Sequence, residues 1–163
     1  MEPRLRPAVS EDGPALLALD AATWSPDVTP APEPGRDAPF FRDGDRPEDV
    51  LVAEVDGRPV GYIQLHQATK LASNAHVLQV RGLAVDPRER GRGVGGSLIE
   101  GAIAEARRRG ARRLTLRVLA PNAAARAAYD ARGFQVEGVL RGEFLLGDRY
   151  VDDVVMALDL TSS

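Results

Sequence analysis

The pattern of apolar and polar residues divides the chain into short strand-like runs and three helical stretches. Runs rich in β-branched and other apolar residues are typical of strands, and those before residue 120 lie at 5–9, 50–55, 59–65, 77–85 and 114–119. Helical patterns follow Ser10, the glycines near residue 95, and Asn122, and we expect Ser10 and Asn122 to act as N-caps. The second helical stretch carries an apolar stripe of Val94, Leu98, Ala102 and Ala106.

Turn residues join these runs into a sheet. The pair Asp56-Gly57 between two strand-like runs predicts a hairpin, and Gly82 inside the run 77–85 indicates a bulge or a close backbone approach. The chain closes with strands expected at 134–139, 143–146 and 150–158, the last two joined at Gly147-Asp148. We predict an α/β fold of the α+β type, a mixed sheet that is antiparallel at its start and has one parallel crossing in the middle.

Composition is compatible with one globular domain, predicted over residues 1–160, with a short tail at 161–163. The hydrophobic fraction of 44% is ordinary, no stretch approaches a membrane span, and the N-terminus lacks the pattern of a signal sequence. The chain has no cysteine, which excludes disulfides and thiol nucleophiles, and no cluster with metal-ligand spacing. Cytoplasm is the default location.

Charge is distributed unevenly, although the net charge is only −3. Residues 81–126 contain eleven arginines and four acidic residues, 11 − 4 = +7, which leaves −10 for the rest of the chain. A local positive field suits a polyanionic ligand. Nucleic acid is not the expected partner, because aromatic residues, which would stack on bases, make up only 5% of the chain.

The segment 88–98 combines four glycines with three arginines, directly after an apolar run and before a helical pattern. Glycine lets a backbone approach a ligand closely, and the first N–H groups of a helix have no partner within the helix. Together with the positive end of the helix dipole they favour an anion, most often phosphate. The alternative is a plain tight turn before a helix, which does not explain so many glycines at a helix start.

Two other phosphate loops are excluded. Gly91, Gly93 and Gly96 satisfy the spacing of the dinucleotide-binding fingerprint, but the next strand ends in Ala120-Pro121-Asn122 without the acidic residue that holds a ribose. A Walker-type loop requires Gly-Lys-Ser/Thr, and the only lysine is Lys70.

The pattern Arg90-x-x-Gly93-x-Gly95 resembles the pyrophosphate loop of the GNAT superfamily of N-acetyltransferases, which use acetyl-coenzyme A. Two flanking segments agree: 82–87, Gly-Leu-Ala-Val-Asp-Pro, is similar to the end of that family's central strand, and 122–134, Asn-x-x-Ala-x-x-x-Tyr-x-x-x-Gly-Phe, is similar to its following motif. The resemblance is strong over residues 77–158. It implies a GNAT-like fold in which strands 77–85 and 113–119 are parallel and splayed, with helices on the flanks.

The resemblance also implies how acetyl-CoA binds. The backbone of the segment Leu83, Ala84 and Val85 is expected to hold the pantetheine arm, through Leu83 and Val85. The pyrophosphate is expected at the loop, with charge added by Arg90 and Arg92, and Asn122 is expected to meet the cofactor. The expected loop residues are Arg90, Gly91, Arg92, Gly93, Val94, Gly95, Gly96 and Ser97.

Tyr129 is the candidate catalytic residue. It lies seven residues after Asn122, about two helical turns, so both residues share a face of the helix. Family members with tyrosine here commonly use it as the general acid that protonates the leaving thiolate; the alternative is a core tyrosine. The general base is open: Glu54, His66, Asp152 or Asp153 acting through water, or an amine that arrives neutral.

The expected partner is a small-molecule primary amine or an amino acid, which attacks acetyl-CoA directly in a ternary complex. Residues 25–47 contain six prolines and show no regular pattern, and in the family this region helps to wall the acceptor pocket. Trp24, Phe40 and Phe41 are pocket candidates, or core residues, and Arg141 is a candidate for an acceptor carboxylate. The alternatives are a protein lysine or N-terminal acetyltransferase, and a sensor that binds acetyl-CoA without turnover. Arg117 stands where some N-terminal acetyltransferases have glutamate. Dimers are common in the family, so a homodimer is possible.

Overall fold

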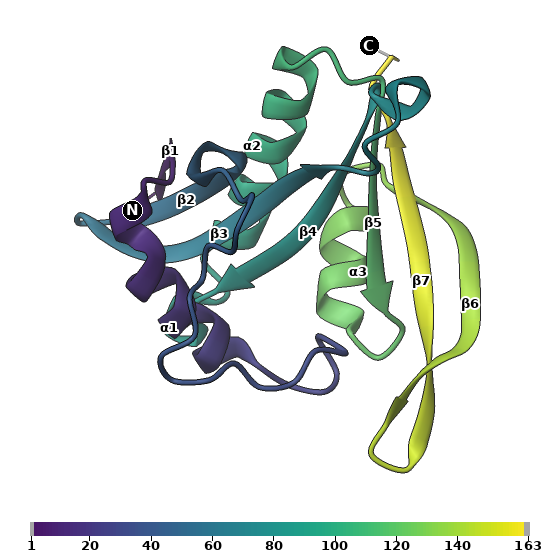
Figure 1. Ribbon diagram of the computed structural model, residues 1–163, viewed down its shortest axis with the longest axis horizontal. Coiled ribbons are helices and arrows are strands. Elements are labelled where there is room, and N and C mark those ends of the chain that lie inside the picture. Colours follow the sequence, from purple (N-terminus) through teal and green to yellow (C-terminus); the bar gives the residue numbers. More distant parts are fainter. Residues whose placement is uncertain (1, 162–163) are drawn as a thin grey trace.

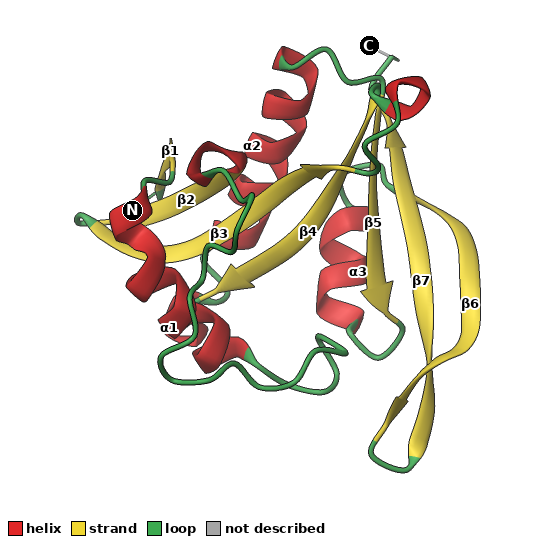
Figure 2. Cartoon of the chain, in the orientation of Figure 1, coloured by secondary structure: helices red, strands yellow, loops and turns green. Residues whose placement is uncertain are grey.

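The computed structural model describes residues 2–161, which form a seven-stranded sheet in the order β1-β2-β3-β4-β5-β7-β6, with helices on both faces (Figures 1 and 2). All neighbouring strands are antiparallel except β4 and β5, which are parallel. The strands are β1 (Arg4–Pro7), β2 (Val50–Val55), β3 (Arg58–Gln67), β4 (Val77–Val85), β5 (Arg113–Leu119), β6 (Gln135–Leu146) and β7 (Arg149–Asp159). The helices are α1 (Gly13–Thr23), α2 (Val94–Arg108) and α3 (Ala123–Asp130), with 3₁₀ turns η1 (Ser10–Asp12), η2 (Pro47–Asp49), η3 (Ala72–Asn74) and η4 (Pro87–Glu89). The predicted mixed sheet with one parallel crossing is confirmed.

The two faces of the sheet carry separate cores, because side chains alternate along each strand. On β3, Ile63 packs in the larger core with Val94 and Leu98 of α2. Its neighbour Tyr62 packs in a smaller core with Leu16 and Leu19 of α1. We call these the α2 face and the α1 face; α3 also lies on the α2 face, where Tyr129 belongs to the larger core. The predicted stripe of α2 is buried as expected.

The turns at both hairpins are where the sequence predicted them. Asp56 and Gly57 join β2 to β3 with φ of 53° and 75°, the positive values that a tight hairpin turn requires. Gly147 and Asp148 join β6 to β7. Two details differ from prediction: β6 is one strand, continuous through two register irregularities, where the sequence indicated two. Ser10 does not cap α1; it lies in η1, and the carboxylate of Asp12 accepts the Val9 N–H at 2.8 Å.

Strand β4 leaves β5 halfway along its length. The parallel ladder joins Val77–Val80 to Arg113–Leu116 and stops at the pair Val80 and Leu116. At the next residue, Arg81, β4 bulges against β3, because Gln64 pairs with Gly82 while Leu65 pairs with Val80. Beyond this point the two strands diverge, as Figure 1 shows. The predicted splay and the predicted bulge near Gly82 therefore coincide, and they open the sheet between the C-terminal ends of β4 and β5.

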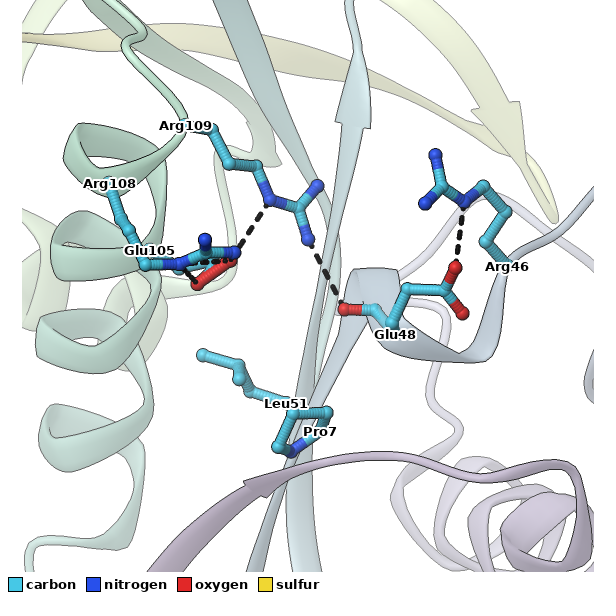
Figure 3. A pocket seen from close by; sticks show the side chains of 7 residues that line it. All are labelled: Pro7, Arg46, Glu48, Leu51, Glu105, Arg108 and Arg109. Atoms are coloured by element: carbon cyan, nitrogen blue, oxygen red, sulfur yellow. Dashed lines mark hydrogen bonds and ion pairs between the residues drawn. The ribbon is translucent and has the colours of Figure 1, made fainter.

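The segment 24–49 is irregular, and hydrogen bonds hold its first part together and its last part to α2. The Trp24 indole N–H donates to the Ala31 carbonyl oxygen at 3.0 Å. At the other end, the Arg109 guanidinium donates to the Asp49 carboxylate at 2.8 Å, to the Glu48 carbonyl oxygen at 3.2 Å, and to Glu105 at 3.1 Å. Figure 3 shows Arg109 spanning the gap from α2 to Glu48. The Arg109 bonds therefore attach the segment to the end of α2, and the Trp24 bond holds two parts of the segment together.

We predict that Phe134→Ala lowers the free energy of unfolding by about 3–5 kcal/mol, because a large buried aromatic side chain leaves a cavity. Phe134 is 1% exposed and its ring packs edge-on against Tyr129. Urea denaturation of the parent and the variant measures the loss. Val136→Ala, at a position 51% exposed, is the control, and a similar change in both variants would contradict the assigned core.

Candidate active site

The glycine-rich loop presents a row of free backbone amides. Gly91 and Gly93 have φ of 79° and 80°, and Gly93 is the N-cap of α2. The Ser97 N–H donates to the Gly93 carbonyl oxygen at 3.0 Å. No acceptor within residues 2–161 receives the backbone N–H groups of residues 90–96. A helix start with several unpartnered N–H groups is a site for an anion.

Two buried carboxylates fix the chain ahead of this loop. Asp86 accepts the backbone N–H of Arg88, and Arg58 of β3 reaches Asp86 at 3.3 Å and Glu89 at 3.0 Å. Hydrogen bonds from the Arg88 side chain and backbone lower the pKa of Asp86 to about 2, so its carboxylate is charged at neutral pH. Arg92 pairs with Glu89 at 3.3 Å, whereas Arg90 forms no ion pair with a described residue. Arg90 therefore contributes an uncompensated positive charge beside the free amides.

The end of β4 lies next to the loop. A Cβ on Gly95 would be 3.7 Å from the Val85 side chain, and Leu83 and Val85 pack against the larger core on the α2 face. The Asp86 N–H donates to Val60 of β3 at 2.7 Å. Because backbone groups alternate in direction along a strand, those of Ala84 point to β3 and those of Leu83 and Val85 point into the opening toward β5. Of the three predicted residues of β4, Leu83 and Val85 thus direct backbone groups to the opening, whereas Ala84 is bonded within the sheet to β3.

Helix α3 carries Asn122 and Tyr129 as predicted. Asn122 is the N-cap, and its side-chain oxygen accepts the Ala125 N–H at 3.3 Å. Its amide N–H₂ group has no acceptor within the described chain, which leaves two donors for a ligand. Tyr129 is 4% exposed, and its hydroxyl likewise has no partner among the described residues. Burial raises the pKa of the Tyr129 phenol, so the group stays protonated at neutral pH.

Arg132 connects α3 to the start of α2, a contact that the sequence did not predict. Its guanidinium donates to the carbonyl oxygens of Gly96 at 3.3 Å and Ala128 at 3.1 Å, and its charge lies 3.6 Å from Glu100. A Cβ on Gly96 would lie 1.9 Å from this guanidinium, so glycine is what admits it. Arg132 and Gly96 are 36 positions apart, so no local sequence pattern predicts their contact. The contact of Arg58 with Glu89 is similarly distant in sequence and was equally unpredictable.

The residues considered as general base are spread over the sheet. Glu54 pairs with Arg6 at 2.9 Å on β2, and the Asp152 carboxylate accepts the Gly142 N–H at 2.8 Å. Asp153 is buried against Arg117, whose guanidinium also reaches Glu143 at 2.8 Å. His66 is half-buried, and burial followed by the charge of Arg81 lowers its pKa. Each of the three carboxylates is already held by a partner inside the chain.

The residues predicted to contact the acceptor lie in three separate places. Phe40 and Phe41 pack against the smaller core on the α1 face, and the Phe40 ring meets the Tyr62 ring edge-on at 5.0 Å. Trp24 is half-buried and bonded to Ala31, so its indole N–H supports the segment 24–49. Arg141 is exposed on β6.

Two cavities of about 510 and 550 Å³ lie at the C-terminal end of α2, away from the glycine-rich loop. The first is lined by Pro7, Leu51 and the ion-paired residues around Arg109 in Figure 3, and neither includes Tyr129. Within residues 2–161, no group of three or more His, Asp or Glu side chains is arranged to hold a metal ion. No helix in the same range has the length and apolar character needed to cross a membrane.

Comparison with known proteins identifies relatives of this chain. An uncharacterized N-acetyltransferase of Methanocaldococcus jannaschii is 36% identical over 99 residues, 60% of this chain and 44% of that protein. The ribosomal protein bS18-alanine N-acetyltransferase of Escherichia coli is 38% identical over 79 residues, 48% of this chain and 53% of that enzyme. The matches thus span about half the length of these curated relatives.

Solved structures share the fold over nearly the whole chain. The smu.2055 protein of Streptococcus mutans superposes with a TM-score of 0.83 at 26% identity, covering 96% of this chain and 99% of that one. The yncA protein of Salmonella typhimurium, solved with its cofactor acetyl-CoA, superposes with a TM-score of 0.78 at 21% identity, covering 100% and 96%. The model of the acetyltransferase (GNAT) family matches residues 15–134. With a match over most of its length, the chain belongs to the GNAT family of acetyltransferases.

Proposed function

We propose that this protein transfers the acetyl group of acetyl-CoA to a primary amine of a small molecule or amino acid, by direct attack in a ternary complex. The observation that carries the proposal is the row of unpartnered amides at residues 90–96, next to the opening between β4 and β5. Membership of the GNAT family supplies the reaction class.

The predicted residues have distinct roles in this proposal. Backbone amides of the loop, together with the charges of Arg90 and Arg92, would bind the pyrophosphate. Backbone groups of Leu83 and Val85 would bond to the amide-containing arm of acetyl-CoA, and the Asn122 amide would donate to it. Tyr129 would give its proton to sulfur as the carbon–sulfur bond breaks, because burial keeps the phenol protonated.

A second candidate is the N-terminal amine of a protein, favoured by the likeness to the bS18-alanine N-acetyltransferase. Arg117, which is paired with Asp153 and Glu143, stands at the position of β5 where some N-terminal acetyltransferases have glutamate. This disfavours a mechanism that needs a free glutamate there. A homodimer also stays a prediction. The edge strand β6 exposes the apolar side chains of Val136, Val139 and Leu145, which offer a surface for such a contact.

An acceptor screen tests the proposed function. Small amines, amino acids and a peptide that begins with alanine are each incubated with acetyl-CoA, and the free thiol released is measured. Release with a small amine or amino acid supports the proposal, and release with the peptide alone supports the second candidate. Binding of acetyl-CoA without any release would indicate the sensor function instead.

We predict that Gly93→Val weakens coenzyme A binding while Gly110→Val does not. Both glycines have φ of 80°, and a Cβ on either would meet nothing within 4 Å, so valine costs about 1–2 kcal/mol of stability at each position. Only Gly93 lies among the free amides, where a side chain would block a ligand. Calorimetric titration with coenzyme A measures both variants; equal affinities would show that the loop is only a turn.

We predict that Tyr129→Phe lowers kcat by roughly a hundredfold or more, with little change in KM, as expected when a general acid is removed. The melting temperature should not fall, because the hydroxyl has no hydrogen-bond partner among the described residues and the ring is retained. Tyr150→Phe, at a side chain 74% exposed, is the control. Turnover within about twofold of the parent, far short of the acid-catalysis range, would assign Tyr129 to the core alone.

A further inference from the structure

Asp20 is a half-buried carboxylate without a cationic partner. The four buried carboxylates, Asp12, Asp86, Glu89 and Asp153, each pair with an arginine. No described arginine, lysine or histidine forms an ion pair with Asp20, and its recorded bond is one accepted from the Tyr62 hydroxyl. A carboxylate removed from water usually finds a cation, because burial without one is costly. The described chain thus supplies no cation to balance the charge of the Asp20 carboxylate.

The position of Asp20 follows from the geometry of α1. Asp20 lies four residues after Leu16 and directly after Leu19, both buried against the sheet, so the helix directs it toward β3. The signal present in the sequence is that Asp20 is the single acidic residue of α1 and stands among apolar positions.

The pair of Asp20 and Tyr62 is located at the opening of the sheet. The Tyr62 hydroxyl lies 3.3 Å from where a Cβ of Gly82 would be, and Gly82 follows the bulge at Arg81. The last parallel pair of β4 with β5 is one residue before that bulge, at Val80. A Cβ on residue 82 would make a tight contact with the Tyr62 ring at 3.3 Å, which glycine avoids. The carboxylate is therefore next to the point where β4 leaves β5.

Asp20 and Tyr129 lie on opposite faces of the sheet. Tyr62 belongs to the core of the α1 face, whereas Tyr129 belongs to the core of the α2 face. The Phe40 ring covers Tyr62 from the segment 24–49, which gives the α1 side an aromatic wall next to the carboxylate. An opening with a protonated phenol on one side and an unpaired carboxylate on the other suits a reaction in which an amine enters opposite the leaving sulfur.

We propose that the Asp20 carboxylate, held by the Tyr62 hydroxyl, binds the ammonium group of the acceptor and takes its proton. This inference rests on the proposed function and deepens it, because it specifies an acceptor that arrives as a cation. Asp20 would be a catalytic residue in direct contact with the substrate, and Tyr62 would be a positioning residue that acts through it.

The protons balance as follows. The ammonium group gives one proton to Asp20, and the freed lone pair bonds to the acetyl carbonyl carbon. The carbon–sulfur bond breaks with its electron pair on sulfur, and the thiolate takes the proton of Tyr129. The nitrogen then loses a second proton to water, from which Tyr129 is reprotonated, and Asp20 returns its proton to the solvent. One acetamide and one free thiol form, and one proton is released.

The surroundings of Asp20 favour a proton acceptor. Burial raises the pKa of Asp20 above its ordinary value, against the opposing effect of the Tyr62 hydrogen bond. Other charged or titratable groups of this face are His66 on β3 and Arg81 on β4. On β5 they are Arg113, which pairs with Glu137, and Arg117, which pairs with Asp153 and Glu143. None of them pairs with Asp20, and in the segment 24–49 the contacts to Tyr62 come from an aromatic ring.

The test is the pH dependence of kcat/KM for an amine found in the acceptor screen. We expect Asp20→Asn to lower kcat/KM by roughly a hundredfold or more near neutral pH and to remove the acidic limb of the profile, with coenzyme A affinity and melting temperature retained. The Tyr62 hydrogen bond lowers the pKa of Asp20, so its removal in Tyr62→Phe should raise that pKa and move the acidic limb to higher pH. Glu11→Gln, an exposed acidic residue in η1, is the control and should match the parent.

Either of two results would overturn the inference in an active enzyme: Asp20→Asn with kcat/KM within about twofold of the parent, against the hundredfold that acid–base catalysis predicts, or Tyr62→Phe with the acidic limb unmoved. Should Asp20→Asn fail to fold, the Tyr62→Phe profile decides. A parent protein that releases no thiol with any amine would overturn the proposed function, and this inference with it.

Discussion

The structure depends on a parallel strand pair that is bonded over only part of its length. β4 and β5 share their ladder at Val77–Val80 and then separate. Backbone N–H and C=O groups inside a protein need partners, and in the middle of a seven-stranded sheet the separated half of β4 has none from β5. The opening is tolerable because a ligand with peptide-like amides can complete the missing bonds. The loop, α3 and α1 are all arranged around this opening.

Ion pairs hold about half of the arginines of this protein, including six of the eleven in the positive segment 81–126. Six of the arginines in the positive segment 81–126 are paired with carboxylates: Arg88, Arg92, Arg108, Arg109, Arg113 and Arg117. The strong positive field that the sequence suggested is therefore mostly neutralised within the fold. Arg90 at the loop and Asp20 at the opening are without ion-pair partners among the described residues. Arg90 could therefore pair with an anionic ligand, and Asp20 with a cationic one. Both lie at the ends of elements that border the opening.

Much of this arrangement was predictable from sequence because it depends on local rules. The Asp56-Gly57 turn, the buried stripe of α2, the Asn122 cap and the left-handed glycines of the loop each follow from a few neighbouring residues. The position of Tyr129 relative to Asn122 follows from helix geometry in the same way. β6 was predicted as two strands because Arg141 and Gly142 interrupt its apolar pattern, whereas pairing with β7 carries the strand through the irregularity.

What sequence reasoning missed depends on contacts between distant positions. Arg58 supports Asp86 and Glu89 from another strand, Arg132 covers Gly96 from another helix, and Asp20 meets Tyr62 across 42 positions. Asp20 illustrates the difficulty best: its importance lies in the absence of a nearby cation, and such an absence is known only when every neighbour has been placed. A pattern of residues on one helix contains no such information.

The irregular segment 24–49 has a consequence for how this protein can diversify. It is held to α2 through Arg109 and Asp49 and to β3 through the Phe40 and Tyr62 rings, and it contributes no strand to the sheet. Closing a longer loop between fixed ends costs only slightly more entropy than closing a shorter one. Changes in the length of this segment, away from the packed Phe40 and Phe41, therefore cost the scaffold little. Evolution can therefore vary this segment, and with it the acceptor that is recognised, while the sheet and the helices keep their structure.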